Sequence, residues 1–284
     1  MKIPLRLVVV MALAPITSLS AADTPATVRA PAPKLGSTVF NWDQLEVKSS
    51  GVGERRDVAR NPTATMAELE CHISTLNPGL PSHPPHIHPQ EELIIIKEGS
   101  LDVHINGVNQ RVGPGSLFFF AAYDSHAVRN VGREPATYYV FNFSTAATKS
   151  LPKVAAAESA GSDKLRSAVY EWSDLPAKPT AKGARRDVFD SPTVTCENLE
   201  CHVTTLRAGE SPHASHRHPD EEIIIVKEGT LEATINGTAH RGGVGTIFFF
   251  GSNDEHGLKN IGTTDATYYV MRIVTDATPK AASL

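Results

Sequence analysis

An excess of positive charge is absent from this chain. Its 284 residues include 27 Lys and Arg against 31 Asp and Glu, which gives a net charge of −4. This balance gives no reason to expect nucleic acid as a partner, and no basic run suggests a membrane surface. The length is sufficient for two ordinary domains with separate cores. We therefore expect a soluble globular protein of two domains.

Long apolar runs are absent as well. The N-terminal apolar segment Leu7–Ala14 follows two basic residues and precedes small residues up to Ala22. It is too short for a bilayer, which needs roughly 20 apolar residues. The layout is typical of a secretory signal that is cleaved after Ser20-Ala21-Ala22. We expect residues 1–22 to be a signal peptide and the mature protein to be periplasmic or extracellular, with no membrane attachment after cleavage.

Cysteine is scarce, with only Cys71, Cys196 and Cys201 in the chain. An exported protein can use disulfides, but three cysteines are too few for a disulfide framework. Cys71 and Cys201 alternate with apolar residues as on a strand that faces a core, so we interpret them as buried thiols. A Cys71–Cys201 bridge would require both residues to lie near an axis that relates the domains, and Cys196 would remain unpaired.

A long internal repeat is the main feature that the sequence does contain. Pro85–Gly99 recurs as Ser215–Gly229, and 216 minus 86 gives an offset of 130 residues. The correspondence continues without a gap on both sides of this stretch. We divide the chain by it into a flexible leader (23–35), a first domain (36–144), a linker rich in Ala, Ser and Lys (145–164), a second domain (165–276) and a tail (277–284).

Each copy has the signals of short strands rather than helices. β-Branched and aromatic runs alternate with Gly, Pro and Asn-Gly, and Asn106-Gly107 and Asn236-Gly237 predict tight hairpins. We therefore expect an all-β protein of two tandem barrels. Phe118–Phe120 and Phe248–Phe250 cannot all enter one core, because neighbouring strand residues point to opposite faces. The other domain or another subunit should cover one face of this strand. A homo-oligomer is therefore one of the two possibilities.

Histidines at equal spacing in the two copies predict a metal site in each. His86 and His88 should share one side of a strand, with Glu92 opening the next strand and His126 arriving 38 residues after His88. Glu91 and Glu221 are competing carboxylates, but Glu92 and Glu222 alternate with the apolar residues so as to point inward. Three imidazoles and one carboxylate suit Mn, Fe, Co, Ni or Zn. The second set consists of His216, His218, Glu222 and His256.

The spacing His86-x-His88-x3-Glu92-x6-Gly99, followed by Gly115, His126 and Asn130, resembles the two signature motifs of the cupins. The second copy fits equally, so the resemblance covers nearly all of the mature chain. It implies a double-stranded β-helix in each half, hence a bicupin, with a divalent metal in each barrel mouth. The usual Pro-x-Gly before the last ligand is Ala121-x-Tyr123 and Gly251-x-Asn253 here. We expect that turn to be built differently.

Further polar residues flank the predicted ligands. Glu70 and His72 alternate along the strand before the first ligand turn, as do Glu200 and His202 in the second copy. They are candidates for an acid, a base or groups that orient the ligands, unless they lie on the outer face. Glu255 precedes His256 where the first copy has Ser125. This difference predicts two unequal sites, with Glu255 a further catalytic candidate.

These features favour an exported bicupin metalloenzyme that acts on a small oxygenated organic molecule. Two open coordination positions suit a carboxylate, an enediol or a phenol together with O2, so decarboxylation and dioxygenation are the nearest reactions. Bicupins of the oxalate decarboxylase and quercetin dioxygenase groups are similar in having two such barrels. The alternative is a non-catalytic protein that binds a sugar or small acid through its metal.

Overall fold

The computed structural model describes residues 32–153 and 163–280. The predicted signal peptide (1–22), residues 23–31 of the leader, the centre of the linker and the last four residues lie outside the described residues. In the part that is described, no helix is long and apolar enough to cross a membrane.

Residues 32–153 of the first half contain ten strands and two short 3-10 helices. They are β1 (Thr38–Phe40), η1 (Trp42–Gln44), β2 (Lys48–Ser50), β3 (Gly53–Asn61), β4 (Glu68–Leu76), β5 (Glu91–Glu98), β6 (Leu101–Ile105), β7 (Val108–Val112), β8 (Leu117–Phe120), β9 (His126–Asn130), β10 (Ala136–Ser144) and η2 (Ala147–Ser150).

The second half repeats this order, except that no counterpart of η2 follows its last strand among the described residues. Its elements are β11 (Ala168–Tyr170), η3 (Trp172–Asp174), β12 (Lys178–Thr180), β13 (Gly183–Ser191), β14 (Asn198–Leu206), β15 (Glu221–Glu228), β16 (Leu231–Ile235), β17 (Thr238–Gly242), β18 (Ile247–Phe250), β19 (His256–Asn260) and β20 (Ala266–Val274).

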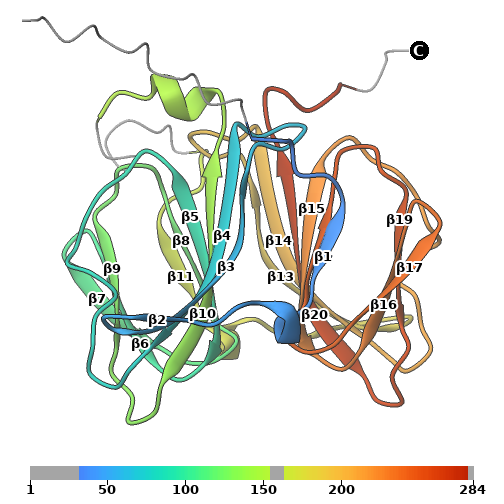
Figure 1. Ribbon diagram of the computed structural model, residues 1–284, viewed down its shortest axis with the longest axis horizontal. Coiled ribbons are helices and arrows are strands. Elements are labelled where there is room, and N and C mark those ends of the chain that lie inside the picture. The colour runs from blue at the N-terminus through green and yellow to red at the C-terminus, as the bar shows by residue number, and fades with distance from the viewer. Residues whose placement is uncertain (1–31, 154–162, 281–284) are drawn as a thin grey trace, which may run out of the picture. The chain divides into compact units, whose positions relative to one another are not determined.

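Each half folds into a jelly-roll barrel that combines a seven-stranded and a three-stranded antiparallel sheet (Figure 1). The large sheet of the first barrel has the order β11-β8-β5-β10-β4-β3-β2, in which β11 comes from the second half of the chain. The small sheet of this barrel has the order β7-β6-β9. At the β6–β7 turn, Asn106 and Gly107 have φ values of 46° and 89°, as the predicted hairpin requires. The prediction of an all-β protein with two tandem barrels is confirmed.

The two halves exchange their first strands. β1 pairs with β18 of the second half, with Val39 opposite Phe248, and β11 pairs in the same way with β8 of the first half, with Val169 opposite Phe118. In Figure 1, β1 lies with the orange strands of the second barrel, as its pairing with β18 requires. The repeat boundaries assign β1 to the first domain, whereas the hydrogen bonds assign it to the second barrel. Each large sheet is complete only with a strand from the other half.

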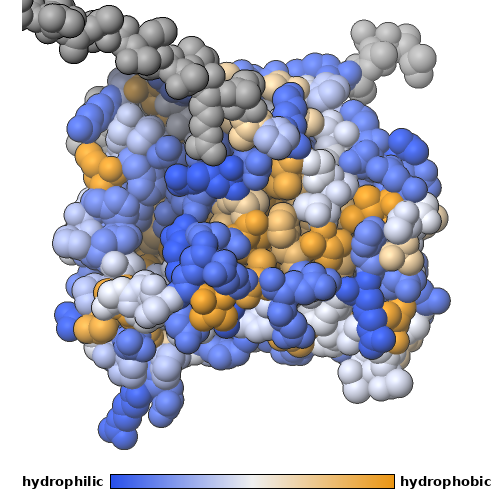
Figure 2. Space-filling model, in the orientation of Figure 1, coloured by the Kyte–Doolittle hydropathy of each residue, from blue (hydrophilic) through white to orange (hydrophobic). Residues whose placement is uncertain are grey.

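The phenylalanine runs divide between two cores. Phe118 and Phe120 pack inside the first barrel, while Phe119 joins a larger core that both halves share. The expectation that another domain or subunit covers one face of this strand is confirmed, and the covering partner is the other half of the same chain. On the face in Figure 2, hydrophobic residues gather toward the middle and hydrophilic residues surround them.

The three cysteines are buried and free, and Cys71 and Cys201 both lie in the shared core. The interpretation of these two residues as buried thiols is confirmed. The linker begins as ordered chain: Thr145 is fully buried and its hydroxyl donates to the carbonyl oxygen of Thr195 at 2.9 Å. The first residues of the predicted linker therefore pack against the second half instead of forming a free connection.

Candidate metal centres

The first histidine cluster forms where the segment before β5 meets the start of β9. The main chains of His86 and His126 bond to each other in both directions, with N to O distances of 3.1 and 3.0 Å. His86 makes only this isolated bridge, and His88 lies in no strand. The expectation that both residues sit on a regular strand is therefore wrong. The bridge to His126 nevertheless places both imidazoles on the same side as the β9 histidine.

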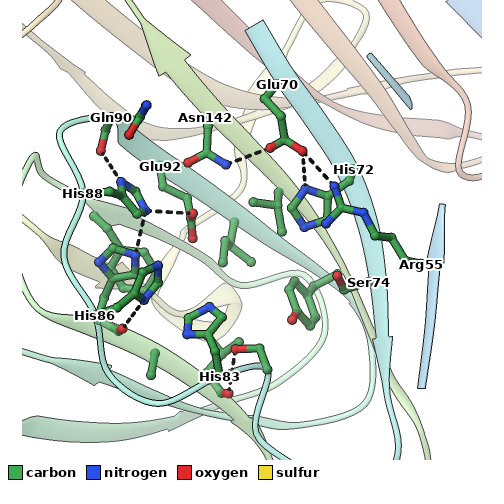
Figure 3. A pocket seen from close by; sticks show the side chains of 18 of the residues that line it. Arg55, Glu70, His72, Ser74, His83, His86, His88, Gln90, Glu92 and Asn142 are labelled. Atoms are coloured by element: carbon green, nitrogen blue, oxygen red, sulfur yellow. Dashed lines mark hydrogen bonds and ion pairs between the residues drawn. The ribbon is translucent and has the colours of Figure 1, made fainter. Parts of the chain in front are cut away.

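The three imidazoles converge on one point in the first barrel. Their ring centroids lie 5.1 Å apart for His86 and His88, 4.6 Å for His86 and His126, and 4.7 Å for His88 and His126. One ligand atom from each residue lies within 4.8 Å of the others. Glu92 Oε2 lies 3.5 Å from His88 Nε2. Figure 3 shows the Glu92 carboxylate directed toward this group.

The hydrogen bonds of the rings decide which nitrogen faces the cluster. His86, His88 and His126 each place Nδ1 against a backbone carbonyl oxygen, at 3.3, 3.0 and 2.8 Å. Carbonyls only accept, so each Nδ1 carries the proton and each Nε2 has a lone pair. The Nε2 atoms of His88 and His126 are only 3.1 Å apart. Two lone pairs at this distance repel unless a cation lies between them, so the donor set fits a divalent metal.

The second cluster repeats the ring spacing with His216, His218 and His256, but among the described residues His216 Nδ1 lacks the hydrogen-bond partner that His86 Nδ1 has. The centroid distances are 5.1 Å for His216 and His218, 4.8 Å for His216 and His256, and 4.7 Å for His218 and His256, and Glu222 Oε2 lies 3.4 Å from His218 Nε2. Among the described residues, the buried Nε2 atoms of His218 and His256 have no hydrogen-bond partner. A metal ion would satisfy both atoms. The chain therefore carries two histidine groups that fit a metal, one in each barrel.

Burial keeps most of these imidazoles neutral, which is the form that binds metals. Burial lowers the pKa of His126 to about 4, and it also lowers the pKa values of His86, His216 and His256. His218 differs: burial acts to lower its pKa, but the carboxylates of Asp220 and Glu222 beside its two ring nitrogens raise the value to about 9. The two clusters thus share a geometry but differ electrostatically.

The two carboxylates at the start of β5 point in opposite directions. Glu92 faces the histidines, whereas Glu91 is fully buried and accepts hydrogen bonds from the hydroxyls of Thr193 and Thr195 in the second half. Burial raises the pKa of Glu91. Glu222 and Glu221 divide in the same way in the second barrel. In each barrel, the carboxylate that we preferred from strand alternation is the one beside the histidines.

A second polar group lines the wall of the first pocket, which has a volume of about 440 Å³. Glu70 Oε1 lies 2.8 Å from His72 Nδ1 and 3.0 Å from Arg55 Nη2, and Glu70 Oε2 accepts a hydrogen bond from Asn142 at 2.8 Å. Figure 3 shows this group across the pocket from the histidine cluster. Glu70 and His72 thus face the pocket and not the outer surface of the barrel.

The second pocket, of about 470 Å³, has a different wall. His202 lines it, and Glu200 Oε1 lies 2.6 Å from His202 Nδ1 and 2.8 Å from Arg185 Nη2. Arg272 occupies the place of Asn142 and does not bond to Glu200. The Oε2 atom of Glu200 is buried and has no hydrogen-bond partner among the described residues.

Glu255 has no place in the second pocket. Its carboxylate pairs with Arg217 at 3.0 Å, with 44% of the Glu255 side chain exposed. The residues that do distinguish the two sites were not predicted from the sequence: Gln90 and Asn142 in the first, Asp220 and Arg272 in the second. The repeat could have revealed them, because its offset of 130 residues aligns Gln90 with Asp220 and Asn142 with Arg272.

Residues 72–142 and 202–272 each match the family model described as Cupin domain. The chain belongs to the cupin family. Because each match lies within one of the two barrels, the protein is a bicupin. A comparison with curated proteins finds no match.

Solved structures resemble this bicupin in fold. A point mutant of the Bacillus subtilis oxalate decarboxylase OxdC has a TM-score of 0.62 at 14% identity, covering 86% of this chain and 79% of that chain. The Lactobacillus farciminis oxalate decarboxylase in its formate complex has a TM-score of 0.62 at 13% identity, covering 86% and 88%. AerE from Microcystis aeruginosa has a TM-score of 0.59 at 17% identity, covering 84% and 97%. At these identities the likeness shows the fold alone.

The turn before the last histidine retains an unusual backbone. Tyr123 and Asn253, which replace the glycine of the cupin pattern, both have φ of 62°. This is the left-handed region that glycine favours. The Tyr123 amide donates to the carbonyl oxygen of His88 at 2.8 Å, so this turn directly supports a predicted ligand. The side chains at this position depart from the cupin pattern, but a left-handed residue remains there.

Proposed function

We propose that this bicupin is an exported metal-dependent enzyme that acts on a small oxygenated organic molecule, by decarboxylation or dioxygenation. One observation carries the proposal: in the first pocket, a cluster of three imidazoles and a carboxylate faces a separate group of Glu70, His72 and Arg55. The first group suits a metal, and the second suits proton transfer.

The polar wall provides a proton donor or acceptor at a defined atom. Because His72 Nδ1 lies against the Glu70 carboxylate, its Nε2 is left to exchange a proton with a molecule in the pocket. In a decarboxylation, Nε2 would deliver the proton that replaces the departing CO2 on carbon. In a dioxygenation, it would accept the hydroxyl proton of a phenol or enediol. Glu70 orients the ring in both cases.

Substrate binding requires the metal and a cation on the wall. The three histidines and Glu92 would hold a divalent metal, which would supply a Lewis acid toward a substrate oxygen. Arg55 lines the same pocket and supplies a guanidinium that attracts a carboxylate, although Asp57 and Glu70 already share it. The pocket volume of about 440 Å³ suits a small molecule.

The comparisons support this proposal at the level of class. Two of the similar structures are oxalate decarboxylases, one of them in a formate complex. A further similar structure comes from work on the Mn(II) centres of the Bacillus subtilis enzyme. We propose Mn, Fe, Co, Ni or Zn as the metal, one ion in each barrel. Oxalate is the first substrate to test, because it is small and carries two carboxylates.

Metal analysis of the protein purified from its native compartment tests the proposal first. We expect Mn or Fe in both barrels, together with CO2 release or O2 consumption on a panel of small carboxylic acids and phenols. His72→Gln should abolish turnover while the metal content stays unchanged. Zinc with tight ligand binding and no turnover would indicate a binding protein instead, and protein without metal in either barrel would overturn the proposal.

Export is tested separately. We expect cell fractionation to find the protein outside the cytoplasm and N-terminal sequencing to find a mature chain that begins at Asp23. An uncleaved chain in the cytoplasm would contradict export without affecting the metal sites.

A further inference from the structure

The two metal clusters have equal ligands but unequal neighbours. Gln90 and Asn142 of the first half correspond to Asp220 and Arg272 of the second. Gln90 and Asp220 each follow a predicted histidine ligand by two residues, and Asn142 and Arg272 occupy equivalent positions on β10 and β20. The exchange converts a neutral pair into an ion pair next to one ligand only.

In the second barrel the ion pair contacts a predicted ligand directly. Asp220 is 4% exposed, and its Oδ1 lies 3.2 Å from Nδ1 of His218. Arg272 holds the same carboxylate through two bonds, from Nε to Oδ2 at 2.7 Å and from Nη2 to Oδ1 at 3.2 Å. The bidentate contact fixes the orientation of the carboxylate, so one oxygen stays directed at the histidine.

The first barrel has no such contact. Nδ1 of His88 lies 3.0 Å from the main-chain oxygen of Gln90, and His218 retains the equivalent contact to the main chain of Asp220 at 2.9 Å. Asn142 donates instead to Glu70. The added feature of the second barrel is therefore the side-chain carboxylate of Asp220.

The Nδ1 hydrogen bond of His218 goes to the main-chain oxygen of Asp220, and the carboxylate adds a negative charge 3.2 Å from the same nitrogen. A negative charge beside Nδ1 increases electron density at Nε2, and loss of a partner that orients a ligand in this way typically costs 10–100-fold in metal affinity. We propose that Asp220, oriented by Arg272, is a positioning residue that makes the second barrel the tighter of the two metal centres. The expected difference is about tenfold or more. This inference rests on the proposed metal binding and concerns how the two centres divide it.

The same exchange explains the unequal pocket walls. Because Arg272 turns to Asp220, Glu200 keeps one buried oxygen without a partner among the described residues, whereas Asn142 completes the contacts of Glu70. The proposed tighter centre therefore shares its pocket with Glu200, which lacks one hydrogen bond. The proposed weaker centre shares its pocket with Glu70, whose two oxygens both have partners.

Mn²⁺ affinity of the isolated centres tests the inference. His86→Ala leaves the second centre as the only complete one, and His216→Ala leaves the first. Equilibrium dialysis of each full-length variant against buffered Mn²⁺ should show that the His86→Ala protein binds about tenfold or more tightly than the His216→Ala protein. Equal affinities would overturn the inference but leave the proposed function standing. An absence of Mn²⁺ binding in both would overturn the two together.

Reciprocal exchange separates positioning from a structural effect. In the His86→Ala background, Asp220→Gln with Arg272→Asn recreates the neutral pair and should weaken Mn²⁺ binding to the level of the first centre. In the His216→Ala background, Gln90→Asp with Asn142→Arg should tighten it. Thermal unfolding of the metal-free variants serves as the control. Weaker binding at the second centre without a gain at the first would overturn the assignment to Asp220, because general destabilisation gives only losses.

Discussion

Thr63 donates a hydrogen bond to the carboxylate of Glu221, 158 residues later in the chain, at 2.7 Å. Thr65 donates to the same carboxylate at 2.8 Å, and the amide of Ala64 does so at 3.0 Å. Glu221 directly precedes Glu222, the carboxylate beside the second histidine cluster. The turn before β4 of one barrel thus holds the strand that carries a predicted ligand of the other barrel.

We expect Glu221→Gln to destabilise the protein by about 1.5–3 kcal/mol, because hydrogen bonds to a charged acceptor are stronger than those to a neutral amide. The side-chain amide of the glutamine would also place an N–H donor against Thr63, Ala64 and Thr65, which all donate to the Glu221 carboxylate. Urea unfolding measures the effect. Glu228→Gln lies on the same strand in an exposed position and should change stability by less than about 0.5 kcal/mol. Equal losses in the two variants would contradict the role of this contact.

Gly245 packs against the indole of Trp42 from the other half. It has φ of 90°, and a Cβ atom there would lie 2.7 Å from Trp42 Cε3. We expect Gly245→Ala to lower the free energy of unfolding by about 1–3 kcal/mol, through backbone strain and displacement of the indole. Gly243→Ala is the matched control, because no atom lies within 4 Å of its Cβ position. A comparable shift in melting temperature for both variants would show that the indole contact does not matter.

Tyr123 and Asn253 adopt the same left-handed backbone at equivalent positions. Asn tolerates this region better than Tyr does, since its short polar side chain bonds locally. We expect Tyr123→Gly to stabilise the protein by about 1 kcal/mol, and Asn253→Gly to have a smaller effect. Calorimetric melting of metal-free protein compares the two. Destabilisation by Tyr123→Gly would indicate that contacts of the ring outweigh the strain.

The three thiols should be inert in the folded protein. Burial raises the pKa of Cys196 to about 12 and raises the pKa values of Cys71 and Cys201 well above the usual range. Only the thiolate reacts, so a thiol reagent at pH 8 should label no cysteine in native protein and three after unfolding. Labelling of fewer than three in the denatured state would reveal a disulfide, contrary to the three free thiols of the structure.

The sequence by itself determined the features that depend on local spacing. The repeat offset, the hairpin at Asn106-Gly107 and the choice of Glu92 over Glu91 follow from strand alternation and turn chemistry, which involve residues close in the chain. The grouping of His86 and His88 followed from their spacing as well, although the segment that carries them is not a regular strand.

Only the tertiary structure decided which distant residues meet. The exchange of β1 and β11 rests on strands of three residues, whose pairing partners no local pattern specifies. The contact of Asp220 with Arg272 joins residues 52 positions apart, and a comparison of ligands alone directs attention to Glu255 instead. Long-range pairing depends on how two barrels pack against each other. The difference between the two candidate metal centres arises from Asp220 and Arg272, which replace Gln90 and Asn142 beside the same set of ligands and meet only when the second barrel folds.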